Sequence, residues 1–258
     1  MDFLNSSNIP IVGILASILA GIATGIGALP IFITRRVSDK TLDTMLGFSA
    51  GVMLAATSFS LIIPAIEFGG GGAKGVLITA AGILMGVVFL DAVDKYSPHM
   101  HTILGNEGSK SSLSKVWLFV IAITIHNFPE GLAVGVGFGS GNISDGISLA
   151  IGIGLQNMPE GLAVALPLLR ENYKKSKAFL IALATGLVEP IGGLIGITAV
   201  QFAKPILPLG LAFAAGAMLF VISDEIIPET HSRGYQRLAT YGVIVGFIIM
   251  MILDNTLG

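Results

Sequence analysis

Cysteine is absent from this 258-residue sequence, and charged residues make up only 12% of it. A soluble domain carries about 25% charged residues, so this chain cannot cover the surface of an ordinary water-soluble globule. Without cysteine, disulfides, thiolate metal sites and cysteine nucleophiles are excluded. The formal net charge of -2 leaves no excess of positive charge for binding phosphates, which excludes nucleic acid as a main partner.

Apolar residues dominate the sequence, at 53% with a mean hydropathy of +0.86. An apolar run of about 20 residues crosses the hydrocarbon of a bilayer as a helix, and eight such runs lie between short polar or Gly/Pro breaks. We therefore predict an all-α integral membrane protein whose residues 1–258 form a single polytopic domain of eight transmembrane helices. Helices one to eight are predicted at residues 9–33, 42–66, 75–94, 116–139, 144–169, 177–202, 206–229 and 234–254.

Basic residues predict the orientation, because Lys and Arg in short loops stay on the cytoplasmic side. Twelve of the fourteen Lys and Arg fall in or beside the loops that follow helices one, three, five and seven. Only Lys74 and Lys204 fall on the opposite side. We therefore expect a multi-pass protein of the cell membrane, such as a bacterial inner membrane, with both termini on the extracellular or periplasmic side.

An inverted repeat is predicted to relate helices one to three to helices six to eight. Residues 48–54 (FSAGVML) and 213–219 (FAAGAML) are identical at five of seven positions. Helices one and six each carry a GxxxG pair, as do helices three and eight, although such pairs alone indicate only close packing. Matched helices run in opposite directions, and transporters built this way place the substrate site at the repeat interface. Helices four and five form the central pair.

The central pair carries a second repeat. His126-Asn-Phe-Pro-Glu-Gly-Leu-Ala-Val in helix four recurs 30 residues later as Gln156-Asn-Met-Pro-Glu-Gly-Leu-Ala-Val in helix five, with seven of nine positions identical. The first and fifth residues of each copy lie on one helix face. Pro129 and Pro159 should kink the two helices, because each leaves a carbonyl of the preceding turn without its donor. Backbone groups that lose their helical hydrogen bonds in the middle of the membrane are tolerated where they line a polar cavity.

Three carboxylates lie at mid-membrane depth, Glu130, Glu160 and, from the middle of helix six, Glu189, whereas no Lys or Arg lies there. Such acids are costly in the bilayer and must be neutralised by protons or by cations. His126, the motif amides and Met53 in helix two favour metal ions, because imidazole, carboxylate and thioether groups suit zinc, cadmium, iron(II) or manganese(II). The motifs could therefore hold two cations, bridged by Glu130 and Glu160.

Three other interpretations of these polar residues are open. They could form a buried hydrogen-bonded cluster that only holds the helices together. They could relay protons in a proton- or cation-coupled carrier of an organic solute. They could also form an intramembrane metalloenzyme with a bound water as nucleophile, although Asn follows His126 and the hydrolytic HExxH arrangement is absent. Metal transport without catalysis is the function that the residues favour.

The paired motifs His-Asn-Phe-Pro-Glu-Gly and Gln-Asn-Met-Pro-Glu-Gly resemble those of the ZIP (Zrt/Irt-like protein) metal transporters, specifically their bacterial GufA-like branch. The resemblance covers essentially the whole chain. It implies uptake of zinc and related divalent metals into the cytoplasm, through a binuclear site at the middle of the membrane. It also implies an elevator-like movement of a transport bundle against a scaffold. The chain could also assemble as a homodimer.

The resemblance also implies a set of ligands, carried over position by position. The first metal site would consist of Met53, His126, Glu130, Gln156 and Glu160. The second would consist of Asn127, Asn157 and Glu189, with Glu130 and Glu160 shared. Many relatives have His where this chain has Gln156 and an acid where it has Asn157. A neutral amide is a weaker ligand than either.

Charged residues near the ends of helices predict a route to and from this site. Two acids at the outer ends of helices two and eight could gather cations at an entrance, and a second group near the cytoplasmic side could receive the outgoing metal. Ordinary solvated helix ends and a generic polar loop are the alternatives. The candidate entrance residues are Glu67 and Asp254, and the candidate exit residues are His99, His101, Asp224, Glu225 and His231.

Overall fold

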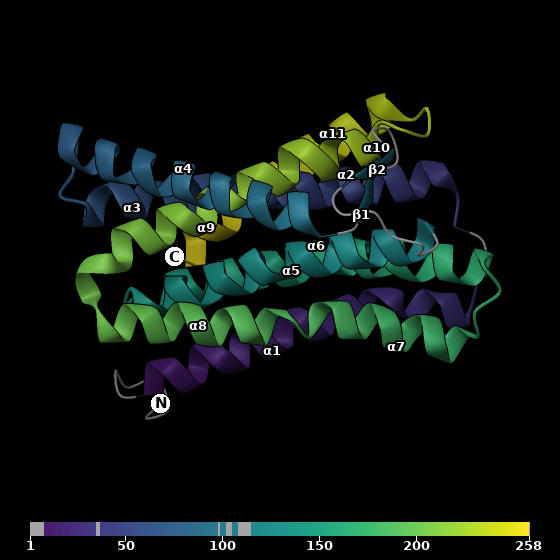
Figure 1. The fold of residues 1–258 in the computed structure, drawn as a ribbon, viewed down its shortest axis with the longest axis horizontal. Helices are drawn as coiled ribbons and strands as arrows, with labels where there is room; N and C mark the ends of the chain where they lie inside the picture. Colours follow the sequence, from purple (N-terminus) through teal and green to yellow (C-terminus); the bar gives the residue numbers. More distant parts are fainter. Residues whose placement is uncertain (1–7, 35–36, 98, 102–104, 108–114, 258) are drawn as a thin grey trace.

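The computed structural model of the chain describes residues 8–34, 37–97, 99–101, 105–107 and 115–257. Helix accounts for nearly all of them, as the apolar runs predicted (Figure 1). Within these residues, eight helical spans are long and apolar enough to cross a membrane, which confirms the predicted number. They are Ile9–Phe32, Asp39–Phe68, Gly72–Tyr96, Val116–Gly139, Ile143–Arg170, Lys175–Phe202, Lys204–Thr230 and Gln236–Leu257.

Several spans are divided into consecutive helical elements. The first span joins α1 (Ile9–Ala28) to the 3-10 turn η3 (Leu29–Phe32), and the second joins α2 (Asp39–Ala55), η4 (Ala56–Ile62) and α3 (Ile63–Phe68). Spans three to five are α4 (Gly72–Tyr96), α5 (Lys115–Gly139) and α6 (Ile143–Arg170). The sixth span joins α7 (Lys175–Gly186) to α8 (Glu189–Phe202). The seventh span joins η5 (Lys204–Ile206), α9 (Leu207–Val221), η6 (Ile222–Ile226) and α10 (Ile227–Thr230). The eighth span is α11 (Gln236–Leu257). Between α4 and α5, β1 (His99–His101) pairs antiparallel with β2 (Gly105–Glu107).

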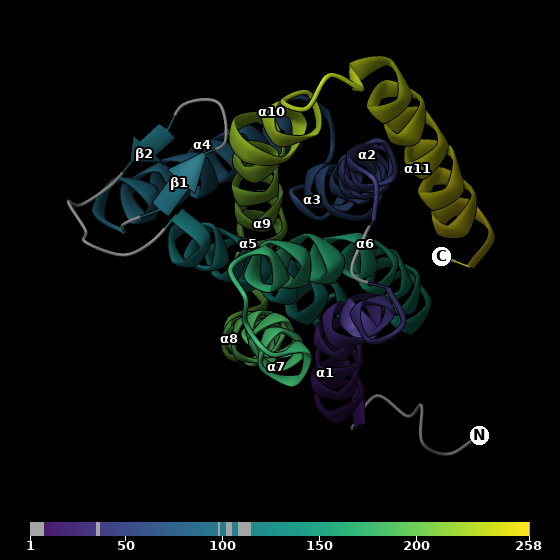
Figure 2. The same cartoon turned by 90° about the vertical axis from the view of Figure 1, so that its right-hand side faces the viewer.

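The helices form two bundles that lie side by side (Figure 2). The motif bundle contains α1, α5, α6, α7 and α8, and therefore both copies of the central motif. The flanking bundle contains α2, α3, α4, α9, α10 and α11. The principal contacts between the two bundles are those of α2 with α6 and of α5 with α9.

Helix pairing follows the predicted inverted repeat. In the flanking bundle α2 packs most extensively on α11, and its repeat mate α9 packs in the same way on α4. In the motif bundle α5 packs on α8 as α6 packs on α1. The glycine of each motif makes this approach possible: a Cβ would lie 2.0 Å from the carbonyl oxygen of Glu189 at Gly131, and 1.8 Å from that of Thr24 at Gly161.

Three spans are interrupted at positions that hydropathy did not show. In the second and seventh spans, the π-helical segments η4 and η6 occupy matching places in the repeat. Each is followed by a proline, Pro64 or Pro228, in the first turn of the next helix. Proline cannot donate to the preceding turn, and a π-helical turn accommodates the altered pairing. In the sixth span the helix breaks at Leu187 and Val188, so that Glu189 begins α8.

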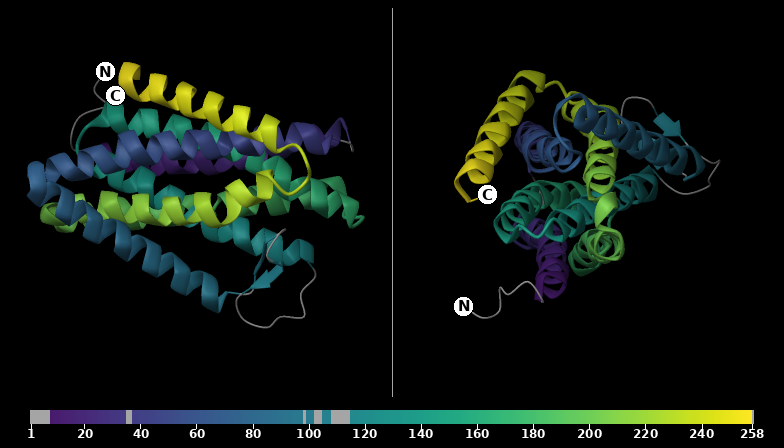
Figure 3. Two further views of the ribbon diagram at one scale, coloured as in Figure 1. Left: turned by 90° about the horizontal axis from the view of Figure 1, so that it is seen from above. Right: turned by 90° about the vertical axis from the view of Figure 1, so that its left-hand side faces the viewer.

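The two central prolines do not interrupt their helices. Pro129 lies within the continuous helix α5, and Pro159 lies within the continuous helix α6. These two spans are also the most enclosed, with 72% of the residues in each apolar window buried, against 22% for α4 and α11. The right-hand panel of Figure 3 shows the molecule from its end, with α4 and α11 at opposite edges and α5 and α6 between the other helices. The paired motifs are therefore held at the centre of the molecule.

Candidate metal centre

The residues predicted to bind metal are all buried, with exposed fractions of 0–1%. Seven belong to the motif bundle and one, Met53, belongs to α2 of the flanking bundle. The site therefore lies where the bundles meet. The motif-bundle residues are His126, Asn127 and Glu130 on α5, Gln156, Asn157 and Glu160 on α6, and Glu189 at the start of α8.

Hydrogen bonds hold some of these side chains in place. The Asn157 amide nitrogen donates to Glu189 Oε1 at 2.6 Å and to the carbonyl oxygen of Ala20 at 2.9 Å, which ties α6 to α8 and α1. Glu160 Oε1 accepts a 2.6 Å hydrogen bond from Ser49 Oγ on α2. These hydrogen bonds hold the Asn157 amide and the Glu189 and Glu160 carboxylates in place, and the motif sequence alone does not predict them.

His126 has a partner from the flanking bundle. Its Nε2 is paired with a carboxylate oxygen of Glu225 on η6, and the two side chains are only 2% and 11% exposed. Nδ1 of His126 has no hydrogen-bond partner among the described residues. A metal ion bound by His126 would therefore either use Nδ1 or displace Glu225 from Nε2.

Many polar atoms of this region lack a hydrogen-bond partner within the part of the chain that the structure describes. A buried polar group without a partner costs about 1–3 kcal/mol, and native proteins contain few of them. The number gathered here therefore indicates a polar ligand at this position. The atoms are both side-chain oxygens of Glu130, both amide atoms of Asn127 and of Gln156, Asn157 Oδ1, Glu160 Oε2 and Glu189 Oε2, in addition to His126 Nδ1.

The acidic and imidazole groups alone do not form a closed coordination shell. Over the described residues, no group of three His, Asp or Glu side chains lies close enough together to hold a metal ion. An ion here would take part of its shell from the amide oxygens and the Met53 thioether, or would draw the carboxylates together.

Comparison with known proteins places the chain in a family. A family model described as "ZIP Zinc transporter" matches residues 105–254. The chain belongs to the ZIP family. It is 47% identical to the zinc transporter GufA of Myxococcus xanthus over 251 residues, which cover 95% of this chain and 99% of that protein. This overlap agrees with the GufA-like branch that the motifs indicated.

More distant ZIP proteins also align along most of the chain. Identity is 42% over 241 residues with the zinc transporter ZIPB of Bordetella bronchiseptica, covering 92% of this chain and 78% of the relative. It is 36% over 321 residues with the human zinc transporter ZIP11, covering 91% of this chain and 94% of the relative. ZIP proteins from bacteria and animals therefore match both the motif bundle and the flanking bundle of this chain.

The two candidate entrance residues differ in their surroundings. Glu67 is exposed near the end of α3, whereas Asp254 is half-buried on α11 and accepts a 2.5 Å hydrogen bond from Ser60. Asp145, near the start of α6, lies close enough to both acids for electrostatic interaction. The sequence reasoning missed Asp145, because only the packing of α6 brings it to the other two.

The candidate exit residues do not form one group among the described residues. Glu225 reaches His126, as described above, and Asp224 beside it is half-buried. The ring of His231 is bonded instead to Thr230 and to the carbonyl oxygen of Ile227, so it is held within its own helix end. The backbone of His99 and His101 lies in β1, while their side chains lie outside the described part of the structure.

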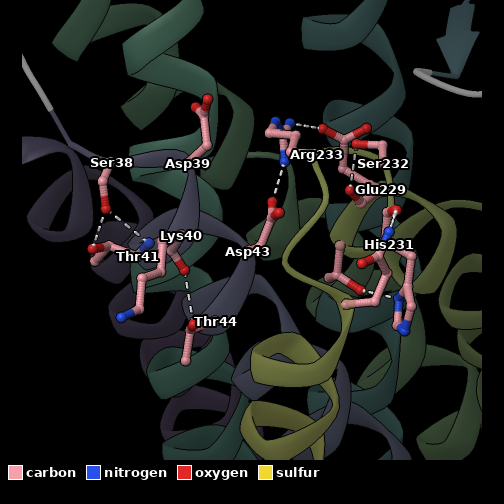
Figure 4. Close-up of polar contacts among 12 residues, drawn as sticks. Ser38, Asp39, Lys40, Thr41, Asp43, Thr44, Glu229, His231, Ser232 and Arg233 are labelled. Atoms are coloured by element: carbon pink, nitrogen blue, oxygen red, sulfur yellow. Dashed lines mark hydrogen bonds and ion pairs between the residues drawn. The ribbon is translucent and has the colours of Figure 1, made fainter.

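An ion-pair network that the sequence did not suggest lies beside these residues (Figure 4). Arg233, between α10 and α11, pairs with Glu229 and, at 2.6 Å, with Asp43, which is fully buried on α2. Burial lowers the pKa of Arg233, but Glu229 and Asp43 outweigh it and raise the pKa above its ordinary value. The network joins α2, α10 and the loop before α11 within the flanking bundle.

Proposed function

We propose that the chain carries divalent transition-metal ions, zinc first among them, across the membrane into the cytoplasm. The observation that carries the proposal is the buried group of unpartnered donor atoms between the two bundles. Imidazole, carboxylate, amide and thioether donors together suit zinc, and also cadmium, iron(II) and manganese(II). The zinc transporters GufA and ZIPB, to which the chain is similar, support zinc as the cargo.

In this proposal the donors form two adjoining metal sites. The first is made by Met53, His126, Glu130, Gln156 and Glu160, and the second by Asn127, Asn157 and Glu189 with the two motif carboxylates shared. Both oxygens of Glu130 lack a partner among the described residues, so Glu130 has the capacity to bridge two ions. Reversible binding suits transport, because a cargo ion must leave as well as enter.

Alternating access would come from movement of the motif bundle against the flanking bundle. Seven of the eight proposed ligands belong to the motif bundle, so most of the coordination shell would move with the ion. Metal would enter past Glu67 and Asp254, with Asp145 as a third acid, and would leave past Asp224, Glu225, His99, His101 and His231. This direction depends on both termini facing the extracellular or periplasmic side, which the distribution of Lys and Arg favours.

A homodimer is part of the hypothesis. The faces of α4 and α11 expose large apolar side chains, which either lipid or a second copy of the chain would cover. The molecular mass of the detergent-purified protein, corrected for bound detergent, decides between one copy and two.

The test of the proposed function is zinc entry into liposomes that contain the purified protein and a zinc-sensitive dye. We expect uptake by the wild type, and no uptake by Glu130→Ala or Glu160→Ala. Glu171→Ala, in the exposed turn after α6, serves as the control and should transport normally. Wild-type protein that neither transports zinc nor retains a metal would point to a structural polar cluster or to a carrier of another solute. Metal-dependent hydrolysis without uptake would point to an enzyme.

A further inference from the structure

Ser49 makes the direct contact between the flanking bundle and a motif carboxylate. Its hydroxyl, on α2, donates to Glu160 Oε1 on α6 at 2.6 Å. Ser49 is 0% exposed and Glu160 is 1% exposed, so water does not compete for the bond. This distance lies toward the short end of the range for O–H···O hydrogen bonds.

The repeat shows that this contact is specific to one half of the molecule. The repeat mate of Ser49 is Ala214, because residues 48–54 align with residues 213–219. The motif mate of Glu160 is Glu130. Ala214 is also 0% exposed but has no hydroxyl, and both oxygens of Glu130 lack a partner among the residues that the structure describes. Among the described residues, the hydrogen bond between Ser49 and Glu160 therefore has no counterpart at the matching positions of the repeat.

Ser49 also shares a helix face with a proposed ligand. Met53 lies four residues further along α2, one turn away on the same side. Both side chains are fully buried, and Ser49 is bonded to Glu160 on α6. Ser49 therefore lies one helical turn from the thioether that we propose as a ligand, while it remains bonded to a proposed carboxylate ligand.

We propose that Ser49 is a positioning residue for metal binding, a role that rests on the proposed function. By holding Glu160 Oε1, it fixes the rotamer in which Oε2, which has no partner in the described residues, is available to a cation. Ser49 acts through Glu160. Partners that orient a ligating carboxylate typically change metal affinity by about 10–100-fold when they are removed.

The test compares Ser49→Thr with Ser49→Val. Threonine and valine have the same shape and differ by the hydroxyl, so any effect of the added methyl group on packing is common to both. We expect Ser49→Val to raise the zinc Kd of the detergent-purified protein, and the KM for uptake, at least tenfold, with the maximal rate little changed. Ser49→Thr should stay within about threefold of wild type. Ser58→Ala is the matched control, because among the described residues the Ser58 hydroxyl bonds only to the Leu54 carbonyl of the same span.

A second comparison distinguishes positioning from a general loss of stability. In a Glu160→Ala background the hydroxyl has no side-chain oxygen to orient, so Ser49→Val should change the zinc Kd of the remaining ligands less than twofold. Equal Kd values for the Thr and Val variants would overturn the proposal, as would a Val effect that persists undiminished beside Glu160→Ala. If the wild type itself neither binds nor transports zinc, the proposed function fails first, and the role of Ser49 fails with it.

Discussion

Replacing Glu130 with methionine should stabilise the metal-free protein while abolishing zinc uptake. The Glu130 side chain is 0% exposed, and neither of its oxygens has a hydrogen-bond partner among the described residues. A buried polar group without partners costs about 1–3 kcal/mol, and methionine fills a similar volume without polar oxygens. At about 2–4 °C per kcal/mol, the melting temperature should rise by about 2–12 °C.

The assay is thermal unfolding in detergent, first with a chelator and then with zinc. Zinc at about 100 times its Kd should stabilise the wild type by about 2.7 kcal/mol and should leave Glu130→Met almost unchanged. Glu160→Met is the matched control. Its metal-free gain should be smaller, because the change also removes the hydrogen bond from Ser49. A metal-free Glu130→Met protein that melts below the wild type would refute the reasoning, since Glu130 would then be a structural anchor.

Three further predictions follow from the same contacts. His126→Ala should lower the zinc retained per chain, measured by elemental analysis after gel filtration, because it removes a ligand; retention equal to wild type would exclude His126 from the site. Uptake should weaken as the pH falls, because metal ligands must be deprotonated; initial dye-reported rates that rise toward acid pH would contradict metal–proton competition. Arg233→Gln should destabilise the protein by about 3–5 kcal/mol, because it leaves the buried Asp43 carboxylate without its cation. Arg170→Gln, which removes an exposed ion pair, should cost at most about 1 kcal/mol in the same melting assay. Equal losses of stability in Arg233→Gln and Arg170→Gln would show that burial of the ion pair does not determine the size of the loss.

Most of the architecture was predictable, because membrane insertion depends on local hydrophobicity. Each span is a run of about 20 apolar residues, and that property can be read from one segment at a time. The inverted repeat was visible at residues 48–54 and 213–219, and the helix pairing agrees with it. The π-helical segments were not visible, because an extra residue in a helical turn leaves the apolar pattern almost unchanged.

The acidic candidate ligands can be named from the sequence for a different reason. A carboxylate in an apolar run needs neutralisation, so Glu130, Glu160 and Glu189 stood out without any knowledge of their neighbours. The hydroxyl of Ser49 did not stand out, because serine in a membrane helix commonly bonds to its own backbone, as Ser58 does. Asp43 was not singled out either, since it lies near the start of a helix, where charged residues are ordinary.

The sequence by itself determined which segments cross the membrane, how they repeat and which buried side chains carry charge, because each of these properties belongs to a single helix. Only the tertiary structure decided which side chains meet. Ser49 and Glu160 are 111 residues apart, and His126 and Glu225 are 99 apart. Their contact depends on the rotation and height of helices in different bundles, and that register is set by the packing of the whole molecule.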